Sequence, residues 1–452
     1  MKKIEKRAVM CLLLCLVLVV GVGVFSYRYV VNGAEWATYK GNRDVYTKGD
    51  IKMGALYDRN GDLLMKNTSD GMEYNSDVNV RKALMHVTGD KDNNISTGAN
   101  RALASELIGY NLINGVYSLN QSGKDVKLTL DADVCATAYK ALGNRKGCVG
   151  VYNYKTGEIV CMVSTPTYDP KNPTKVSSSD SSGVYINRFT SAKFAPGSTF
   201  KLLTAVAALE NLSDAKNFTV RCTGREDYGH GDKVTDLSVH GTVDMEKALE
   251  VSCNIYFGQL AQKVGGSTIK KYVKKTGLDS SYDIDGIKTT AGTFKYPSSG
   301  VNLAWTGIGQ YQDMVNPCAM MVFMGGIANG GTAVNPHLVV RDSIVDKIKE
   351  KVTGSSTKKT KMLQSSTAST LKSMMSNNVT NHYGSNMFPG LDVCAKSGTA
   401  EVGGNKRPNA WFVGFLNDDS NPYAFVVMVE NGGYGTSTSG TIANTVLQSL
   451  VN

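Results

Sequence analysis

The pattern of apolar and polar positions divides the chain into three parts. An unbroken apolar run, residues 8–25, follows a basic N-terminus. Residues 33–125 are polar and contain only short apolar segments, with a hairpin predicted at 54–67 around an Asn-Gly turn. From residue 126 onward the apolar periodicity becomes stronger. We therefore expect a membrane helix, a small strand-containing pedestal domain at 33–125 and a large domain at 126–452.

The large domain is predicted to be α+β. Alternating apolar residues predict a hairpin at 148–164, and three late strands at 394–401, 409–416 and 423–431. The connections between the strands are short, so the strands should be antiparallel. Residues 204–330 are mostly helical in pattern. The segment 316–331 has Asn at a helix N-cap position, Pro in the first turn and Gly at its end, and a last helix is expected at 440–451. We expect one antiparallel five-stranded sheet flanked by helices, with the helical region inserted between the hairpin and the late strands.

The apolar run has the length of a membrane span. Eighteen helical residues cover about 27 Å, close to the thickness of a hydrocarbon core. The basic residues Lys2, Lys3, Lys6 and Arg7 favour the cytoplasmic side. We expect a cytoplasmic tail at 1–7, a transmembrane anchor at 8–27 and an extracytoplasmic catalytic domain. The alternative is a cleaved signal peptide, but the run is long and no A-x-A site follows promptly.

Composition excludes several classes of protein. The net charge is +10 over 452 residues, and the Lys and Arg residues are scattered, so we expect no nucleic-acid partner. Nine cysteines, two of them in the apolar run, form no Cys-x-x-Cys pair, and we interpret the other seven as buried small hydrophobes. The five histidines form no pair with metal-ligand spacing, so neither a metal nor a cofactor is expected.

The first candidate for chemistry is a serine at the start of an apolar helix. Pro196 and Gly197 allow a sharp entry, and the residues from Thr199 onward suit a helix. Lys201 follows Ser198 at i+3, so its amine should lie on the same face. Burial lowers the pKa of an amine, which can then accept the serine proton. Ser-x-x-Lys also occurs at 213–216, 267–270 and 369–372, where a solvated helix surface is the simpler interpretation.

Two further motifs add polar groups at separate points of the chain. Ser252 and Asn254 stand two residues apart within an apolar segment. Lys396, Ser397 and Thr399 lie on a predicted strand with a glycine between them, an arrangement that suits a substrate carboxylate. Each motif alone is weak, because similar triplets occur elsewhere in the chain as caps or turns.

The three motifs in this order resemble those of the penicillin-binding proteins, specifically the class B type that contains only the transpeptidase. Further family-like segments are DRNG at 58–61, GIGQ at 307–310 and NAWFVGF at 409–415. The resemblance implies a peptidoglycan D,D-transpeptidase that crosslinks stem peptides and is inhibited by β-lactams. It also implies a partner that polymerises glycan, expected to be a multi-spanning membrane protein.

The resemblance implies roles for the first two motifs. Ser198 would attack the carbonyl of the penultimate D-alanine and form an acyl-enzyme. Lys201 would be the base, Ser252 would relay a proton towards the leaving amine, and Asn254 would hold the substrate backbone.

It implies roles for the third motif as well. Lys396, Ser397 and Thr399 would bind the terminal carboxylate, and Gly398 would let the substrate approach the strand. The backbone N–H groups of Ser198 and Thr399 would form the oxyanion hole.

Other functions share these motifs. A D,D-carboxypeptidase or endopeptidase differs only in whether water or an amine accepts the acyl group, which the motifs do not separate. A serine β-lactamase usually has a much shorter chain. A non-catalytic penicillin sensor would need a cytoplasmic effector, and only seven residues precede the apolar run.

Overall fold

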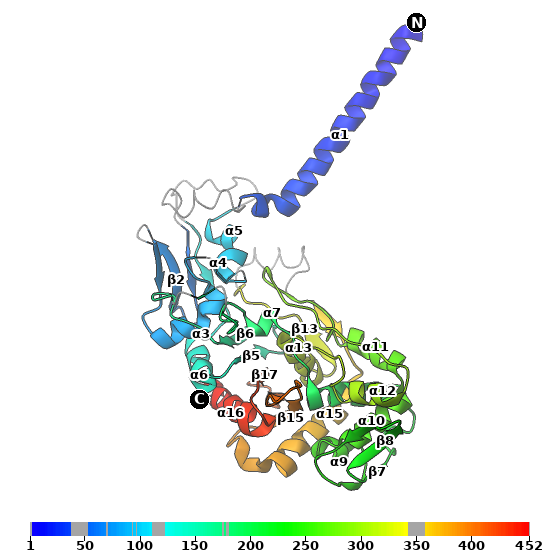
Figure 1. Ribbon diagram of the computed structural model, residues 1–452. Helices are drawn as coiled ribbons and strands as arrows, with labels where there is room; N and C mark the ends of the chain where they lie inside the picture. The colour runs from blue at the N-terminus through cyan, green and yellow to red at the C-terminus, as the bar shows by residue number, and fades with distance from the viewer. Residues whose placement is uncertain are drawn as a thin grey trace.

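The protein consists of a long N-terminal helix, a small sheet and a large α+β domain (Figure 1). The computed structural model describes residues 2–37, 53–68, 71–92, 94–95, 97–110, 123–173, 176–177, 180–341 and 358–451.

The N-terminal helix α1, Lys2–Ala37, projects away from the rest of the protein (Figure 1). Its segment Lys2–Ala34 is long and apolar enough to cross a membrane, and no part of its most apolar window is buried within the protein. An apolar helix of this length, whose most apolar window is not covered by the rest of the protein, is typical of a membrane span. The helix is therefore consistent with the predicted single-pass anchor.

The small N-terminal sheet has the strand order β3-β2-β1-β4. The predicted hairpin is confirmed as the antiparallel pair β1–β2, and the Asp58 carboxylate holds its turn by accepting the backbone N–H groups of Asn60 and Asp62 at 2.8 Å each. β4 pairs in parallel with β1, so the chain enters the large domain through this sheet. Two short helices, α4 and α5, follow within residues 99–107. The elements are β1 (Ala55–Tyr57), β2 (Leu63–Thr68), β3 (Gly71–Tyr74), α3 (Val78–Thr88), α4 (Ala99–Ala102), α5 (Ala104–Leu107) and β4 (Val126–Lys127).

An ion pair joins this region to the large domain. The Arg81 guanidinium on α3 donates to both oxygens of Asp169, with Nε–Oδ1 at 2.8 Å and Nη2–Oδ2 at 2.7 Å. The side chains are only 9% and 11% exposed. This geometry is the bidentate form in which an Arg–carboxylate pair is strongest.

The central sheet contains five antiparallel strands in the order β15-β16-β17-β5-β6. Strands from both ends of the large domain therefore join in one sheet, as the sequence predicts. All eight residues of β16 are buried, which requires cover on both faces of the sheet. The strands are β5 (Gly147–Asn153), β6 (Ile159–Thr165), β15 (Val393–Ala400), β16 (Asn409–Leu416) and β17 (Tyr423–Val429).

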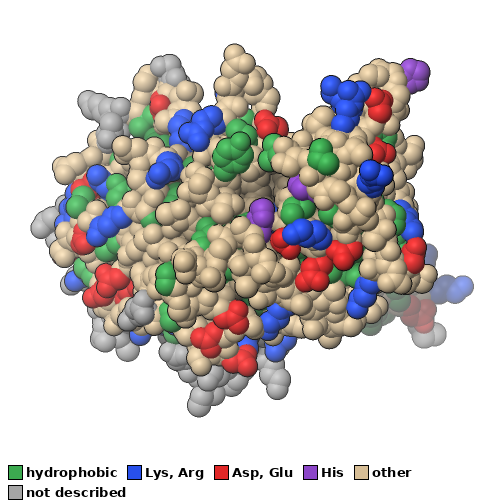
Figure 2. Space-filling view, turned by 90° about the horizontal axis from the view of Figure 1, so that it is seen from below, with side chains coloured by type: hydrophobic (Ala, Val, Ile, Leu, Met, Phe, Trp, Pro, Cys, Tyr) green, Lys and Arg blue, Asp and Glu red, His purple; other side chains and the backbone are tan. Residues whose placement is uncertain are grey.

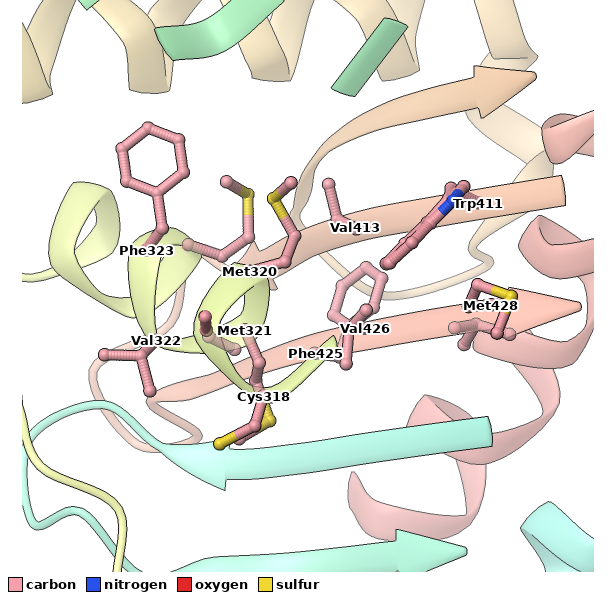
Figure 3. Close-up of a cluster of buried hydrophobic side chains, with 14 of the residues drawn as sticks. Cys318, Met320, Met321, Val322, Phe323, Trp411, Val413, Phe425, Val426 and Met428 are labelled. Carbon is pink, nitrogen blue, oxygen red and sulfur yellow. The ribbon is translucent and has the colours of Figure 1, made fainter. Parts of the chain in front are cut away.

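Apolar helices cover the sheet. The helix α13, Pro317–Ala328, packs on β16 and β17 (Figure 3). Its predicted N-cap is confirmed, because the Asn316 side chain accepts the N–H groups of Cys318 and Ala319. The helices α6 (Ala132–Leu142) and α16 (Thr441–Val451) pack on each other and on the sheet. The side chains in Figure 3 that form the contact are Cys318, Met320, Met321, Val322, Phe323, Trp411, Val413, Phe425, Val426 and Met428.

The segment between β6 and α13 contains more strand than the sequence predicts. Four short strands of three to five residues, β7–β10, form two antiparallel pairs beside the helices. These strands are short and mostly polar, so their periodicity does not stand out from loop sequence. The elements are α7 (Arg188–Ser191), α8 (Lys201–Leu209), β7 (Val220–Cys222), β8 (Arg225–Gly229), β9 (Asp232–Thr235), β10 (Gly241–Val243), α9 (Met245–Glu250), α10 (Asn254–Val264), α11 (Gly266–Lys275), β11 (Asp283–Ile284), β12 (Ile287–Lys288) and α12 (Gly300–Gly307).

The last elements lie between α13 and α16. They are β13 (Thr332–Val334), β14 (Lys359–Lys361), α15 (Ser365–Asn377), the π-helical turn η3 (Asn378–Gly384), the 3₁₀ turn η4 (Ser385–Met387) and the π-helical turn η5 (Thr436–Gly440).

Charge on the surface is mixed. On the face seen in Figure 2, the Lys and Arg side chains are interspersed with Asp and Glu. This distribution agrees with the scattered charge in the sequence and with a solvated surface.

Candidate active site

Ser198 lies in a tight turn at the start of an apolar helix. The turn η2, Gly197–Phe200, is a 3₁₀ helix, and the α-helix α8 begins only at Lys201. The predicted α-helix from Thr199 therefore starts two residues later than expected, because Gly197 enters the turn with φ of 54° and a tighter winding follows. The Lys201 backbone N–H donates to the Ser198 carbonyl. Ser198 itself is partly exposed, as a nucleophile requires.

Neighbouring segments fix this turn from two sides. The Gly197 N–H donates to the carbonyl of Gly309 at 2.9 Å, which places the GIGQ segment directly behind the serine. The indole N–H of Trp411 on β16 donates to the Ala195 carbonyl at 2.9 Å. The Thr199 hydroxyl closes the turn by donating to the Pro196 carbonyl. The serine is therefore held by both the sheet and the inserted region.

Ser252 and Asn254 lie where α9 ends and α10 begins. Ser252 has φ of 58°, a left-handed conformation that non-glycine residues adopt rarely. Asn254 is the first residue of α10, and its side-chain amide donates to the Thr235 carbonyl at 2.9 Å. A residue held in a strained conformation needs strong surrounding contacts, and it often occurs at a functional site.

The amine of Lys201 joins the first motif to the second. Its Nζ lies 2.5 Å from the Ser252 carbonyl oxygen, 3.1 Å from the Ser252 hydroxyl and 2.7 Å from Oδ1 of Asn254. The side chain is fully buried. Burial lowers the pKa of Lys201 to about 8, against a smaller opposing effect of the Asp236 carboxylate. A substantial fraction of this amine is therefore neutral near physiological pH.

Lys396 approaches the same hydroxyl from the sheet. Its Nζ donates to the Ser252 hydroxyl at 3.0 Å and to the Ser397 carbonyl at 3.0 Å. Burial, and secondly the nearby Lys201, hold the pKa of Lys396 well below its usual range. The Ser252 hydroxyl thus lies between two desolvated amines, an arrangement that can pass a proton in either direction.

The strand β15 packs directly against the serine turn. A Cβ added to Gly398 would lie 2.8 Å from Cγ2 of Thr199 and 3.0 Å from the Pro196 carbonyl. A Cβ added to Gly197 would lie 2.7 Å from the carbonyl of Thr399. Glycines are therefore required on both sides of this contact, and they bring the third motif against the first.

Tyr383 is a site residue that the sequence does not predict. Its hydroxyl accepts the Ser397 N–H at 2.8 Å and lies 3.1 Å from the Ser397 hydroxyl. Burial raises the pKa of this phenol, so it stays protonated. Tyr383 comes from the turn η3, which has no chemical motif, so only the fold places it here.

The structure brings the three predicted motifs together. Hydrogen bonds connect Lys201, Ser252, Asn254 and Lys396, and close packing connects the Ser198 turn to β15, which contains Ser397, Gly398 and Thr399. A partly exposed serine one turn from a buried amine with a lowered pKa is the arrangement of an acyl-transferring serine enzyme.

The seven cysteines outside α1 are buried and free, as predicted. Two of them are not isolated hydrophobes, however. Cys222 and Cys253 lie beside Asp236 and His240. Their polar neighbours are not visible in the sequence, because spacing along the chain does not reveal contacts between remote segments.

Comparisons with known proteins agree with this class. Residues 147–448 match the model of the penicillin binding protein transpeptidase domain. The chain is 28% identical over 366 residues to the peptidoglycan D,D-transpeptidase PbpA of Mycobacterium tuberculosis, covering 74% of this chain and 73% of that protein. It is 27% identical over 334 residues to penicillin-binding protein 3 of Bacillus subtilis, covering 69% and 48%.

Solved structures share the fold. Penicillin-binding protein A of M. tuberculosis superposes with a TM-score of 0.76 at 23% identity, covering 89% of this chain and all of that one. Its penicillin G acyl-enzyme complex gives a TM-score of 0.74 at 22% identity, covering 89% of this chain and 100% of that one. Because the domain match covers most of the chain, the protein belongs to the penicillin-binding protein transpeptidase family. The resemblance found from the three motifs is confirmed.

Proposed function

We propose that this class B penicillin-binding protein crosslinks peptidoglycan stem peptides through an acyl-enzyme on Ser198. The observation that supports this function best is the hydrogen-bonded series Lys201–Ser252–Lys396 beside the serine turn. The two amines are buried, and Ser198 is partly exposed. Relatives named as D,D-transpeptidases support the same reaction.

Acylation begins at Ser198. Its Oγ attacks the carbonyl of the penultimate D-alanine, and neutral Lys201 takes the hydroxyl proton. The peptide C–N bond then breaks, and the leaving amine of the last D-alanine receives a proton through the Ser252 hydroxyl. The contacts of Ser252 with both Lys201 and Lys396 fit this relay. An ester between the stem peptide and Ser198 remains.

The second half-reaction uses the same groups in reverse. The amine of a neighbouring stem attacks the ester carbonyl and loses a proton to the Lys201–Ser252 pair. The C–O bond to Ser198 breaks, and the serine recovers its proton. The net result is one amide bond broken and one formed, so the crosslink needs no external energy source. A β-lactam enters by the same first step and leaves slowly.

Substrate recognition is assigned to β15 and to Asn254. Lys396, Ser397 and Thr399 bind the terminal carboxylate, and a bound anion raises the depressed pKa of Lys396 towards its charged form. Gly398 provides the room for this approach. Backbone N–H groups of Ser198 and Thr399 stabilise the oxyanion, an effect of about 10²–10³ in rate per donor. Asn254 holds the peptide backbone of the stem.

The regions outside the active site have proposed roles as well. α1 anchors the protein in the cell membrane with residues 1–7 in the cytoplasm and the catalytic domain outside. Residues 33–125 form a pedestal, and residues 126–452 form the transpeptidase domain.

A multi-spanning membrane polymerase supplies the glycan strands. Co-purification at native expression levels tests this partner, and recovery of the protein without any polymerase would count against it.

Product analysis tests the function. The full-length protein in detergent is incubated with a pentapeptide-stem substrate and an amine acceptor, and the products are separated by mass spectrometry. The proposal predicts a transfer product that is absent from Ser198→Ala and present with Ser213→Ala, an exposed serine in a repeat of the same motif. Release of D-alanine with only the hydrolysed stem would instead identify a carboxypeptidase.

A further inference from the structure

Four side chains that can bind a metal ion meet behind the Ser252–Asn254 segment. They are Cys222, Asp236, His240 and Cys253, and one ligand atom of each lies within 4.8 Å of the other three. The two cysteines are buried, and the side chains of His240 and Asp236 are 13% and 3% exposed. The spacing Cys-x13-Asp-x3-His-x12-Cys follows no common motif, so the group is visible only in the fold.

Three distances within this cluster match the edges of a tetrahedral zinc site. Nδ1 of His240 lies 3.4 Å from Oδ2 of Asp236, and Sγ of Cys222 lies 3.5 Å and 3.7 Å from these same two atoms. With Zn–S of about 2.3 Å and Zn–N or Zn–O of about 2.0–2.1 Å, tetrahedral ligand atoms lie about 3.3–3.8 Å apart. The His–Asp separation is longer than a usual hydrogen bond of about 2.9 Å. A shared central ion explains these distances better than direct pairing.

Backbone groups orient the ligands as in metal sites. Sγ of Cys253, at the N-terminus of the eleven-residue helix α10, accepts the Tyr256 N–H at 3.4 Å. Oδ2 of Asp236 accepts the Asn254 N–H at 2.7 Å. Such outer hydrogen bonds hold ligand atoms in place.

We propose that Cys222, Asp236, His240 and Cys253 bind one structural Zn²⁺ ion. Two thiol ligands and one imidazole favour zinc over the oxygen-preferring calcium and magnesium. All four positions are filled by protein groups, which is typical of a structural site and leaves no open position for catalysis.

The ion has a clear place in the architecture. Cys222 and His240 lie at the end of the β7–β10 pair, where Cys222 is opposite Gly241, and Cys253 lies between Ser252 and Asn254. Zinc therefore ties this strand pair to the segment that contains the left-handed Ser252. Its effect on catalysis, which rests on the proposed function, is to position Ser252 and Asn254 against Lys201.

Metal analysis of the full-length protein tests the site. Protein purified in detergent without chelators, then equilibrated with ZnSO₄ and desalted, is expected to hold about one zinc per chain. His240→Ala and Cys222→Ala should each lower this content at least about fivefold, because removal of one ligand opens the site. The matched controls His230→Ala, an exposed histidine in the neighbouring hairpin turn, and Cys318→Ala, a buried cysteine in α13, should retain it.

A second measurement decides the case in which a ligand variant fails to fold. Wild-type protein stripped by a chelator and titrated with Co²⁺ should show a thiolate-to-cobalt charge-transfer band. Alkylation of unreduced protein after denaturation in chelator, followed by mass spectrometry, should show that Cys222 and Cys253 form no disulfide. A wild-type protein that binds less than about a tenth of an equivalent of zinc, or a Cys222–Cys253 disulfide, would overturn the inference.

Acylation kinetics separate this inference from the proposed function. Ser198→Ala should retain its zinc although it loses penicillin labelling. Removal of zinc from the wild type should slow labelling at least about tenfold, and ZnSO₄ should restore it, because Ser252 and Asn254 lose their support. Unchanged labelling after complete zinc removal would refute the positioning effect.

Discussion

The lowered pKa of Lys201 predicts how acylation depends on pH. Burial lowers this pKa from 10.5 to about 8. At pH 7 about 9% of the amine is then neutral, against about 0.03% for an unperturbed lysine, so burial increases the concentration of the base about 300-fold. Only the neutral amine accepts the Ser198 proton. The acylation rate should therefore rise with pH and level off above pH 8.

The size of the effect can be measured. Between pH 6 and pH 9 the neutral fraction rises from about 1% to about 91%, which predicts an increase of about 90-fold in the second-order acylation rate constant. The assay is time-resolved labelling of the full-length protein with a fluorescent penicillin, with separate correction for the stability of the probe at each pH. The apparent midpoint belongs to Lys201 and Lys396 together, because their amines interact.

Variants define which group titrates. Lys201→Ala should lower the rate by about 10²–10⁴ and remove most of its dependence on pH. Lys216→Ala changes an exposed lysine in a repeat of the same motif and should leave both unchanged. A rate that is constant from pH 6 to pH 9, or a midpoint near 10.5, would refute the assignment of neutral Lys201 as the base.

Three further predictions concern the contacts that build the site and the fold. Gly398→Ala should lower the acylation rate at least about tenfold with little loss of soluble protein, because the added Cβ forces β15 away from the serine turn; a wild-type rate would show that the strand adapts. Tyr383→Phe should lower the rate several-fold, since the buried strand N–H loses its acceptor at a cost of about 1–3 kcal/mol, and the same labelling assay measures it. Arg81→Ala leaves the largely buried Asp169 carboxylate unpaired and should lower the free energy of unfolding by about 3 kcal/mol in denaturant titrations. Arg59→Ala breaks the pair with Glu158, in which each side chain is 31% exposed, and should lower the free energy of unfolding by no more than about 1 kcal/mol. Equal losses for the two arginines would contradict this reasoning.

The sequence predicts the central sheet well because its strands have strong local signals. The segment 410–416 contains no polar side chain, and the structure forms β16 over 409–416. The helix α13 is likewise predicted from its Asn and Pro start. The strands β7–β10 are missed because they are short and polar, and their pairing depends on the helices around them.

The chemistry of the site is predicted in part. The motifs identify Ser198, Lys201 and Lys396, because each motif places reactive groups within a few residues of one another. Tyr383 and the cluster of Cys222, Asp236, His240 and Cys253 are missed, because their partners are remote in the sequence. The pKa of Lys201 also depends on burial from several segments, so sequence gives its direction and only the fold gives its size.

Locating the acyl group shows most directly whether Ser198 is the nucleophile. The full-length protein is treated with benzylpenicillin, digested and analysed by tandem mass spectrometry beside Ser198→Ala and the control Ser213→Ala. We expect one penicilloyl adduct on Ser198 in the wild type and in Ser213→Ala, and none in Ser198→Ala. An adduct on another residue, or undiminished acylation of Ser198→Ala, would contradict this assignment.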